Sequence, residues 1–347
     1  TWWKEGLLIP FDALPNLNLE KGYWDQNIND ALSIGGVQYI AEGAFNLDIY
    51  DLTFCLLFNK TLAAQFDLDD HYAAVKNGTW TYEQMLAQMQ AVSADINGDG
   101  KQDEADRWGY TSHPKMVAPG FWIGGGVTSI TKDADDIPYI SMTEERFVSA
   151  FDAYMALVHD SNAAYLTEGD KLDIPTECRT VFEEDRALFI DMSFFFIESM
   201  RGMDTDFGII PYPKYDEAQE NYRSMMNNSS MGISIPVSVK DAEQVGTIVE
   251  ALNAYSYLHL KDAYYETMLK GKLARDSQSV DMLDIITSTI VVDYGVMNEN
   301  TWGNVISSWL TSIQDHGAGN LASLAASNME KFNTLYEEIL AAYESQP

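Results

Sequence analysis

The sequence predicts an α/β fold, and three observations lead to that prediction. Segments with the spacing of amphipathic helices alternate with short apolar runs that are bounded by turn residues. Apolar residues make up 46% of the 347 residues, which is enough for a sizeable core. A chain of this length is too long for one small core, so it fits two lobes or one large α/β unit.

Four helices are predicted from capping residues and from the spacing of apolar side chains. Thr81 begins the first, with Gln84 at the capping-box position, and Thr143 begins the second, with acidic residues in its first turn. Asp241 begins the third, and the fourth lies near the C-terminus. The faces that we expect to point inward are Tyr82, Met85, Leu86, Met89 and Val92; Phe147, Phe151, Tyr154 and Val158; Val245, Ile248, Val249 and Leu252; and Leu324, Met329, Phe332, Leu335, Tyr336, Ile339 and Tyr343.

Buried strands are predicted where short apolar runs end at turn residues. These runs are 37–41, 53–58, 187–191, 206–210 and 231–235. No internal repeat and no Pro/Gly-rich linker is found, so a two-lobed chain would cross between its lobes on strands. The segment 208–213 reads as such a crossing, because its two prolines hold it in an extended path.

The charge balance is strongly acidic, with 53 Asp and Glu against 21 Lys and Arg and a formal net charge of −32. Such a surface repels phosphate backbones and anionic membranes, so we expect no nucleic-acid partner. It suits a secreted, highly soluble protein with a neutral or cationic ligand, and solubility alone would also explain the acid excess. No apolar run is long enough to span a bilayer.

The two cysteines, Cys55 and Cys178, lie far apart and belong to no Cys-x-x-Cys or Cys/His pattern. Cys55 sits in an apolar run, where a thiol behaves as a small hydrophobe. We therefore expect buried free thiols, and a disulfide between the two stays open as an alternative.

The run 95–106 has the spacing of an EF-hand calcium loop. Oxygen-bearing side chains fall at loop positions 1, 3, 5, 9 and 12, and Gly100 falls at position 6, where the chain must turn sharply. The predicted ligands are Asp95, Asn97, Asp99, Lys101 through its backbone carbonyl, Asp103 and Asp106. A strand follows the loop, so the expectation is an isolated loop with a structural calcium ion. The alternative is an acidic surface turn.

An ordered set of landmarks runs along nearly the whole chain. They are Leu57-Phe58-Asn59-Lys60, Gly78-Thr79-Trp80-Thr81, the calcium-type loop, Trp108-Gly109-Tyr110, Phe182-Glu183-Glu184-Asp185-Arg186-Ala187-Leu188-Phe189, Asp206-Phe207-Gly208-Ile209-Ile210-Pro211 and Gly232-Ile233-Ser234-Ile235-Pro236. In this order they resemble the family 1 extracellular solute-binding proteins of Gram-positive gut bacteria. The ordered set carries the resemblance, since no single motif in it is decisive.

The resemblance implies a two-lobed periplasmic-binding-protein-like fold of type II, similar to maltose-binding protein, with ligand trapped between hinged lobes. It assigns 1–49 and 211–294 to lobe 1, and 50–210 and 295–347 to lobe 2. Family members carry further N-terminal elements of lobe 1 after a lipoprotein signal with an anchoring cysteine. We therefore expect lobe 1 to be incomplete at its N-terminus in this chain.

The function implied by the resemblance is that of an extracellular receptor of an ABC importer, anchored to the cell surface as a lipoprotein. Such a receptor captures a sugar or oligosaccharide, closes about its hinge, and delivers the ligand to the permease subunits as a monomer. The sequence leaves open which sugar is bound, and whether the ligand is a peptide or polyol instead.

Candidate ligand-binding residues come from positions similar to those that line the cleft in the family. Phe121 and Trp122 precede a run of three glycines, Phe194 follows the strand that ends at Asp191, Trp302 follows the third presumed crossing, and Asp51 lies at the first. Aromatic faces and planar polar groups are what sugar recognition requires. For each aromatic residue the alternative is a role in the hydrophobic core, and for Asp51 the alternative is a hydrogen bond within the hinge.

Enzymatic motifs are missing from the sequence. The five histidines form no HExxH or other ligand spacing, and no Gly-x-Ser-x-Gly elbow occurs. No pair of carboxylates is singled out as a glycosidase pair. We therefore expect a binding protein rather than an enzyme, with a carbohydrate-active enzyme or its substrate-binding module as the alternative.

Overall fold

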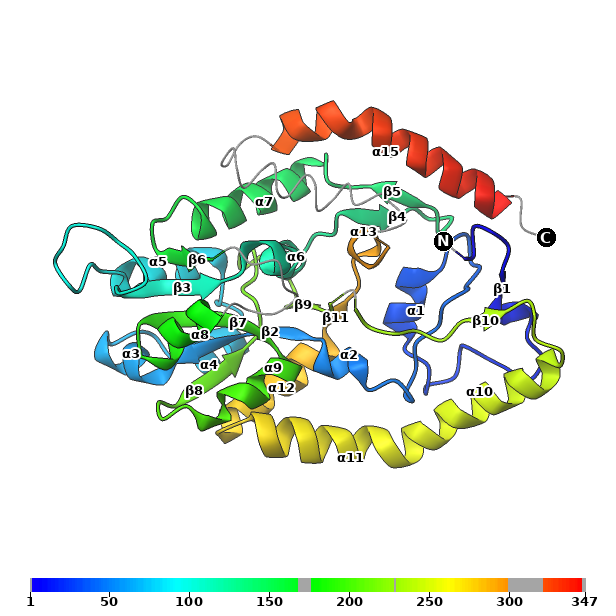
Figure 1. Cartoon of the computed structure of the whole chain (residues 1–347), viewed down its shortest axis with the longest axis horizontal. Helices are drawn as coiled ribbons and strands as arrows, with labels where there is room; N and C mark the ends of the chain where they lie inside the picture. The colour runs from blue at the N-terminus through cyan, green and yellow to red at the C-terminus, as the bar shows by residue number, and fades with distance from the viewer. Residues whose placement is uncertain (1, 168–175, 228, 299–320, 345–347) are drawn as a thin grey trace.

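The computed structural model describes residues 2–167, 176–227, 229–298 and 321–344 (Figure 1). It has the α/β fold that the sequence predicts. The centre is a five-stranded mixed sheet in the order β6-β3-β7-β2-β8, in which β3 runs parallel to β6 and β7, whereas β2 runs antiparallel to β7 and β8. Its strands are β2 (Phe54–Asn59), β3 (Trp108–Ser112), β6 (Ala164–Leu166), β7 (Ala187–Ser193) and β8 (Phe207–Ile210).

The strands β2 and β7 form the middle of this sheet because their sequences are almost continuously apolar. Every residue of both strands is buried, as is typical of strands that are covered on both faces. Leu57 of β2 pairs with Ile190 of β7 on one side and with Ile209 of β8 on the other. The predicted strands 53–58, 187–191 and 206–210 are therefore confirmed.

The predicted strands 37–41 and 231–235 are wrong as regular strands. They meet at one isolated pair, between Ala41 and Ile233, next to a two-residue pairing of β1 (Leu8–Ile9) with β10 (Ile235–Pro236). The backbone N–H of Glu42 donates to Oδ1 of Asn29, at 2.7 Å, instead of extending a ladder. A side-chain amide thus takes the place of a neighbouring strand.

Helices cover the central sheet (Figure 1). Thr81 caps α5 (Tyr82–Val92) as predicted, and its hydroxyl accepts from the backbone N–H of Gln84. Helix α7 (Glu145–Val158) is capped by Glu144, one residue later than predicted, and its expected inward face is buried. The other helices of this part are α3 (Lys60–Gln65), α4 (His71–Asn77), α6 (Pro114–Gly124), α8 (Thr176–Glu183), α9 (Phe194–Ile197) and α12 (Ser277–Ser288).

One long helical run lies along one side of the molecule (Figure 1). It begins as α10 (Ala242–Ser256) and continues through the π-helical turns Tyr257–Lys261, α11 (Asp262–Tyr264) and the π-helical segment Tyr265–Leu273. Asp241 caps α10 as predicted, with its side chain accepting from the backbone N–H of Gln244 at 2.9 Å. The run reaches from the region of β1 and β10 to α9 and α12, and so connects the two ends of the molecule.

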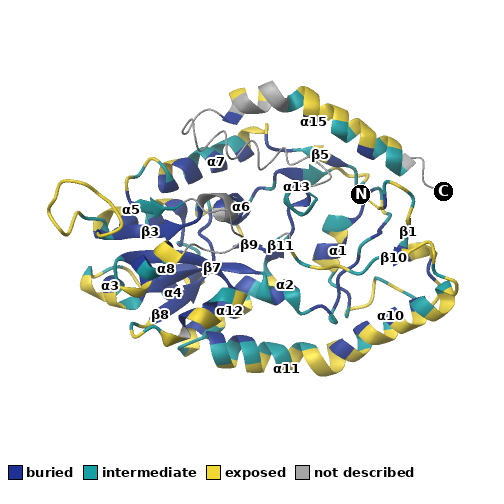
Figure 2. Ribbon diagram, in the orientation of Figure 1, coloured by how far each residue is buried: buried dark blue, intermediate teal, exposed yellow. Residues whose placement is uncertain are grey.

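The inward face predicted for α10 is partly wrong. Val249 is buried, but Ile248 and Leu252 are exposed, and Figure 2 shows much of the outer side of this helix as exposed. The buried side is Gly246, Val249, Asn253 and Ser256. Gly246 lets this side of α10 approach the backbone at Pro15, because a Cβ at position 246 would lie 2.1 Å from the carbonyl oxygen of Pro15.

The buried apolar residues form two clusters. The large one surrounds the central sheet, and a small one consists of Phe11, Leu14, Trp24, Ala41, Ile235 and Val249, all from segments assigned to lobe 1 by the sequence. The C-terminal helix α15 (Leu321–Glu344) buries Phe332 and Ile339, and the Tyr343 hydroxyl donates to the carbonyl of Gly35 at 2.9 Å. The lobe boundaries themselves stay a prediction.

The remaining elements are short. They are α1 (Gln26–Leu32), α2 (Asp48–Asp51), α13 (Tyr294–Met297), the antiparallel pair β4 (Ile130–Lys132) and β5 (Pro138–Ile140), and the parallel pair β9 (Ser224–Met225) and β11 (Ile290–Val291). Cys55 and Cys178 are both buried free thiols, as expected. In the part of the chain that the structure describes, no helix is long and apolar enough to cross a membrane.

Candidate functional site

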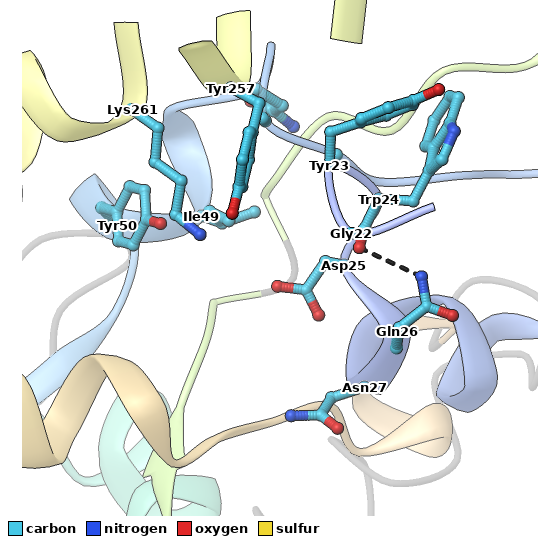
Figure 3. Close-up of a pocket in the computed structure, with 13 residues that line it drawn as sticks. Gly22, Tyr23, Trp24, Asp25, Gln26, Asn27, Ile49, Tyr50, Tyr257 and Lys261 are labelled. Atoms are coloured by element: carbon cyan, nitrogen blue, oxygen red, sulfur yellow. Dashed lines mark hydrogen bonds between the residues drawn. The ribbon is translucent and has the colours of Figure 1, made fainter. Parts of the chain in front are cut away.

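A cavity of about 210 Å³ lies where the start of α1, the helix α2 and the long helical run meet (Figure 3). We call it the aromatic pocket. Its lining combines the aromatic residues Tyr23, Trp24, Tyr50 and Tyr257 with the carboxylate of Asp25, the ammonium of Lys261 and the amides of Gln26, Asn27 and Asn46. The mixture of flat apolar faces and a few polar groups is typical of small-molecule sites.

The first wall of the aromatic pocket is the segment that enters α1. Trp24 forms an isolated antiparallel pair with Gly43, and the Asp25 carboxylate caps α1 by accepting from the backbone N–H of Ile28 at 3.0 Å. Only glycine fits at position 43, because a Cβ there would lie 2.9 Å from the Trp24 ring and 2.1 Å from Oδ1 of Asn253. Backbone pairing and a helix cap therefore fix the position of the Asp25 side chain.

Glu250 of α10 holds the two aromatic side chains of this wall. One carboxylate oxygen accepts from the Tyr23 hydroxyl at 2.5 Å, and the other accepts from Trp24 Nε1 at 3.1 Å. Burial and the neighbouring Glu250 raise the pKa of Tyr23 to about 12, so its hydroxyl stays protonated and continues to donate. Glu250 is a positioning residue, since it acts on the pocket through these two rings.

The opposite wall is formed by Tyr50 of α2 and by Tyr257 and Lys261 of the long helical run. The Lys261 ammonium lies 5.4 Å from the centre of the Tyr257 ring, a cation–π contact, and no described carboxylate forms an ion pair with it. Figure 3 shows Lys261 and the Tyr257 hydroxyl facing the Asp25 carboxylate across the pocket. A ligand between them could accept hydrogen bonds from Lys261 and the Tyr257 hydroxyl and donate one to the Asp25 carboxylate.

Asn46 and Glu42 support the pocket from behind. The Glu42 carboxylate is almost completely buried and accepts from Nδ2 of Asn46 at 2.7 Å. Burial raises the pKa of Glu42 to about 7. Oδ1 of Asn46 accepts from the backbone N–H of Asp48 at 3.1 Å, which ties the start of α2 to the same group.

A second cavity of about 210 Å³ follows along the same helical run. It is lined by Asp51, Phe194, Phe195, Glu198 and Tyr264, with Met268, Leu269, Lys272 and Leu273 from the π-helical segment. The Tyr264 hydroxyl donates to the Asp51 carboxylate, and the Tyr264 ring stacks on Tyr50 with the ring centres 6.2 Å apart. Tyr50 lines the aromatic pocket while Asp51 and Tyr264 line the second cavity, so these contacts lie where the two cavities adjoin.

One face of the helical run borders both cavities. Tyr257 and Lys261 line the aromatic pocket, and Tyr264, Met268 and Lys272 line the second cavity. Residues spaced by three or four positions share a helix face. We call the two cavities together with this face the groove.

The structure brings together two of the predicted ligand residues, Asp51 and Phe194, at the second cavity. Burial raises the pKa of Asp51, against the lowering effect of the Tyr264 hydrogen bond. Phe194 is only 1% exposed, whereas its neighbour Phe195 is 61% exposed. The accessible aromatic face at the end of β7 therefore belongs to Phe195.

Phe121 and Trp122 lie elsewhere, on α6, and both are completely buried. Phe121 packs against Tyr110, Tyr154 and Tyr212, and the Trp122 indole donates to Oδ2 of Asp293 at 3.0 Å. Both have the contacts of core aromatic residues here. Trp302 lies outside the described residues.

The calcium-type loop is exposed over most of its length, and Gly98 and Gly100 have positive φ angles of 75° and 80°. Its carboxylates accept from loop amides: Asp95 from the N–H groups of Gly98 and Gly100, and Asp106 from those of Ile96 and Asp103. Backbone donors, that of Asp103 above all, lower the pKa of Asp106. Among the described residues, no group of three or more His, Cys, Asp or Glu side chains is placed to hold a metal ion.

Most residues of the aromatic pocket were not singled out from the sequence. Trp24 belongs to no recognisable motif, and Asp25 has the pattern of an ordinary helix cap. Tyr257 and Lys261 follow an apolar helix, and only their four-residue spacing and their aromatic and cationic character distinguish them. The missing information is tertiary, because 22–27, 43–50 and 257–261 meet only in the folded chain.

No protein-family model matches the chain, and no curated protein matches it in sequence. Solved structures do match it in fold. A cyclo/maltodextrin-binding protein in complex with maltotetraose has a TM-score of 0.63 at 11% identity, over 98% of this chain and 79% of that one. An ABC substrate-binding protein from Listeria monocytogenes in complex with cycloalternan has a TM-score of 0.58 at 11% identity, over 98% and 82%.

A third match is UgpB from Mycobacterium tuberculosis in complex with glycerophosphocholine, with a TM-score of 0.62 at 15% identity, over 97% of this chain and 81% of that one. The chain has the two-lobed fold of ABC-importer solute-binding proteins. This confirms the fold that the resemblance implied. Of these three proteins, the two in complex with maltotetraose and cycloalternan are binding proteins.

Proposed function

We propose that this protein is an extracellular receptor of an ABC importer that binds an oligosaccharide in the groove. The observation that carries the proposal is the groove itself. One helix face presents Tyr257, Lys261 and Tyr264 to two successive cavities, each with a carboxylate, Asp25 or Asp51, on its other side. An extended ligand would make the same kinds of contact in both.

The chemistry of the groove suits a sugar. Aromatic rings pack against the C–H faces of a pyranose, and carboxylates, amides and ammonium groups bond its hydroxyls. Each cavity alone is smaller than the roughly 300–1,000 Å³ of typical small-molecule sites. A ligand of several sugar units that occupies both is therefore a better fit than a single compact molecule.

Neighbours in fold support the ligand class. Among the matched structures are complexes with maltotetraose and cycloalternan, both oligosaccharides. The groove is bordered by segments that the sequence assigned to both lobes, and in a two-lobed receptor a ligand that contacts both lobes shifts the equilibrium towards the closed form. Transfer to permease subunits, surface anchoring as a lipoprotein and a monomeric state complete the proposal.

The test is a thermal-shift screen with maltotriose, maltotetraose and cycloalternan, followed by analysis of the recovered sugar. A ligand that binds only the folded state raises the melting temperature by mass action, by an amount that grows with its concentration. The proposal predicts a shift with at least one oligosaccharide, which is recovered unaltered. Release of a shorter product would favour the carbohydrate-active enzyme instead, and the absence of any shift would remove the sugar assignment.

We also propose that the loop 95–106 takes up a structural calcium ion. The support is the spacing of Asp95, Asn97, Asp99, Asp103 and Asp106, together with the sharp turn at Gly100. Calcium would draw the carboxylates from the loop amides to one centre, so calcium but not magnesium should raise the melting temperature. The variant Asp99→Ala, which removes the side-chain oxygens at loop position 5, should lose that rise, and an equal rise with both metals would contradict the proposal.

A further inference from the structure

A larger cavity, of about 650 Å³, lies beside α1 and β11. Its lining comes from three segments that are distant in sequence: α1, residues 221–223 before β9, and residues 288–292 around β11. Only Asn27 lines both this cavity and the aromatic pocket. The cavity is therefore distinct from the groove.

Arg223 is the cation of this cavity, and no residue that the structure describes pairs with it. Its side chain is half-buried, and no described carboxylate or carbonyl accepts a hydrogen bond or ion pair from its guanidinium. This is unusual in a chain with 53 Asp and Glu and only 21 Lys and Arg. Partly burying a guanidinium without a partner costs free energy, and natural proteins normally pair such a group.

The surroundings of Arg223 add to this imbalance. Burial lowers the pKa of Arg223, and the like charge of Arg146 lowers it further. Arg146 stacks on the Tyr215 ring, 4.2 Å from its centre, and donates to the carbonyl of Gly125 at 3.5 Å, whereas its contact with the Asp216 carboxylate is a long one, at 3.8 Å. Asn27 and Asn221, which also line the cavity, form no side-chain hydrogen bond with described residues. The guanidinium of Arg223 and the amides of Asn27 and Asn221 thus line one cavity without an acceptor from the described residues.

One acidic residue, Asp30, lies at the edge of the cavity. It is exposed to solvent and forms no ion pair with Arg223, so water screens its charge. The ammonium of Lys132 contacts the carbonyl of Asp30 and pairs with Asp136 at 2.8 Å, which places a further positive charge beside it. Asp30 therefore offsets the attraction of Arg223 for an anion only weakly.

We propose that this cavity is a second binding site, which takes a small anion with a carboxylate or phosphate group, and that Arg223 binds that group. A planar guanidinium can donate two parallel hydrogen bonds to either kind of group. The amides of Asn27 and Asn221 would bind the remaining oxygens. The site is independent of the sugar assignment, since it shares only one lining residue with the groove.

The experiment titrates the protein with sodium phosphate and with sodium succinate, at an ionic strength held constant with chloride, and follows binding by calorimetry. The variants are Arg223→Gln, Arg223→Lys and Asn221→Ala. The matched control is Lys76→Gln, which removes one positive charge from a surface pair with Asp281, at 2.7 Å, far from the cavity in sequence. Circular dichroism of each variant checks that it is folded before its binding is compared.

We expect saturable binding of one anion by the wild type, at least tenfold weaker binding by Arg223→Gln, intermediate binding by Arg223→Lys and unchanged binding by Lys76→Gln. A response to phosphate alone or to succinate alone supports the site and identifies its ligand group. The proposal is overturned if neither anion binds more tightly than chloride, or if Arg223→Gln and Lys76→Gln bind equally well. Should Arg223→Gln fail to fold, weakened binding by Asn221→Ala decides in the same way.

Discussion

At the scale of single residues, the buried carboxylates have the largest electrostatic consequences. Asp191 lies fully buried in β7, where one of its oxygens accepts from the Tyr212 hydroxyl at 3.0 Å and the hydroxyls of Ser112 and Tyr110 lie beside the carboxylate. Burial raises the pKa of Asp191 to about 7. The ionised form of Asp191 is therefore unfavourable in the core, where β7 lies between β2 and β3.

This shift predicts how stability depends on pH. Because the pKa of Asp191 is higher in the folded than in the unfolded chain, the folded state binds more protons between about pH 4 and pH 7. The contribution of Asp191 to the free energy of unfolding is fully present below its pKa in the unfolded chain, about 4, and is lost as the pH rises through about 7. Most of this loss falls between pH 4 and pH 7, and between pH 6 and pH 8 we expect Asp191 to lower the free energy of unfolding by about 1 kcal/mol.

The measurement is the denaturant midpoint of the wild type and of Asp191→Asn at pH 6 and pH 8. Asn is nearly isosteric and cannot ionise, so the variant should lose about half of the decrease. Glu42, whose pKa is also raised to about 7, should account for what remains. Asp135→Asn, at an exposed position, is the control and should behave as the wild type. An equal decrease in Asp191→Asn and the wild type would contradict this account.

At the scale of elements, caps and apolar periodicity predict where helices and central strands lie. Thr81 and Asp241 begin helices as the sequence indicates, and β2, β7 and β8 occupy the predicted apolar runs. The same periodicity could not choose the buried face of α10, because both of its sides are rich in apolar residues. The close approach at Gly246 decides which side is inside, and that contact involves Pro15, far away in sequence.

The assignment of faces on α10 predicts two different costs of truncation. Val249→Ala should lower the free energy of unfolding by roughly 1–3 kcal/mol, because Val249 belongs to the small apolar cluster. Ile248→Ala, one residue away and 57% exposed, should change it by about 0.5 kcal/mol or less. Chemical denaturation of the two variants checks this, and a larger loss for Ile248→Ala would show that the helix has the opposite orientation.

At the scale of the whole molecule, the ordered landmarks predicted the two-lobed fold, which the solved structures confirm. The site was less predictable. Asp51 and Phe194 were found because they follow recognisable crossings and strands, whereas Asp25, Tyr50 and Tyr257 are brought together by the long helical run that passes both cavities. The sequence alone predicts the main elements of the fold, but the groove depends on the packing of segments more than 200 residues apart.

The central claim is that the groove binds an oligosaccharide, and calorimetric titration of maltotetraose into the wild type and Tyr257→Ala tests it most directly. Tyr255→Ala is the matched control, since Tyr255 is exposed on the same helical run but lines neither cavity. We predict saturable binding of one ligand by the wild type and the control, and binding about tenfold weaker by Tyr257→Ala, equivalent to about 1.4 kcal/mol. Equal affinity in all three proteins would contradict the placement of the ligand, and no binding by the folded wild type would contradict this choice of sugar.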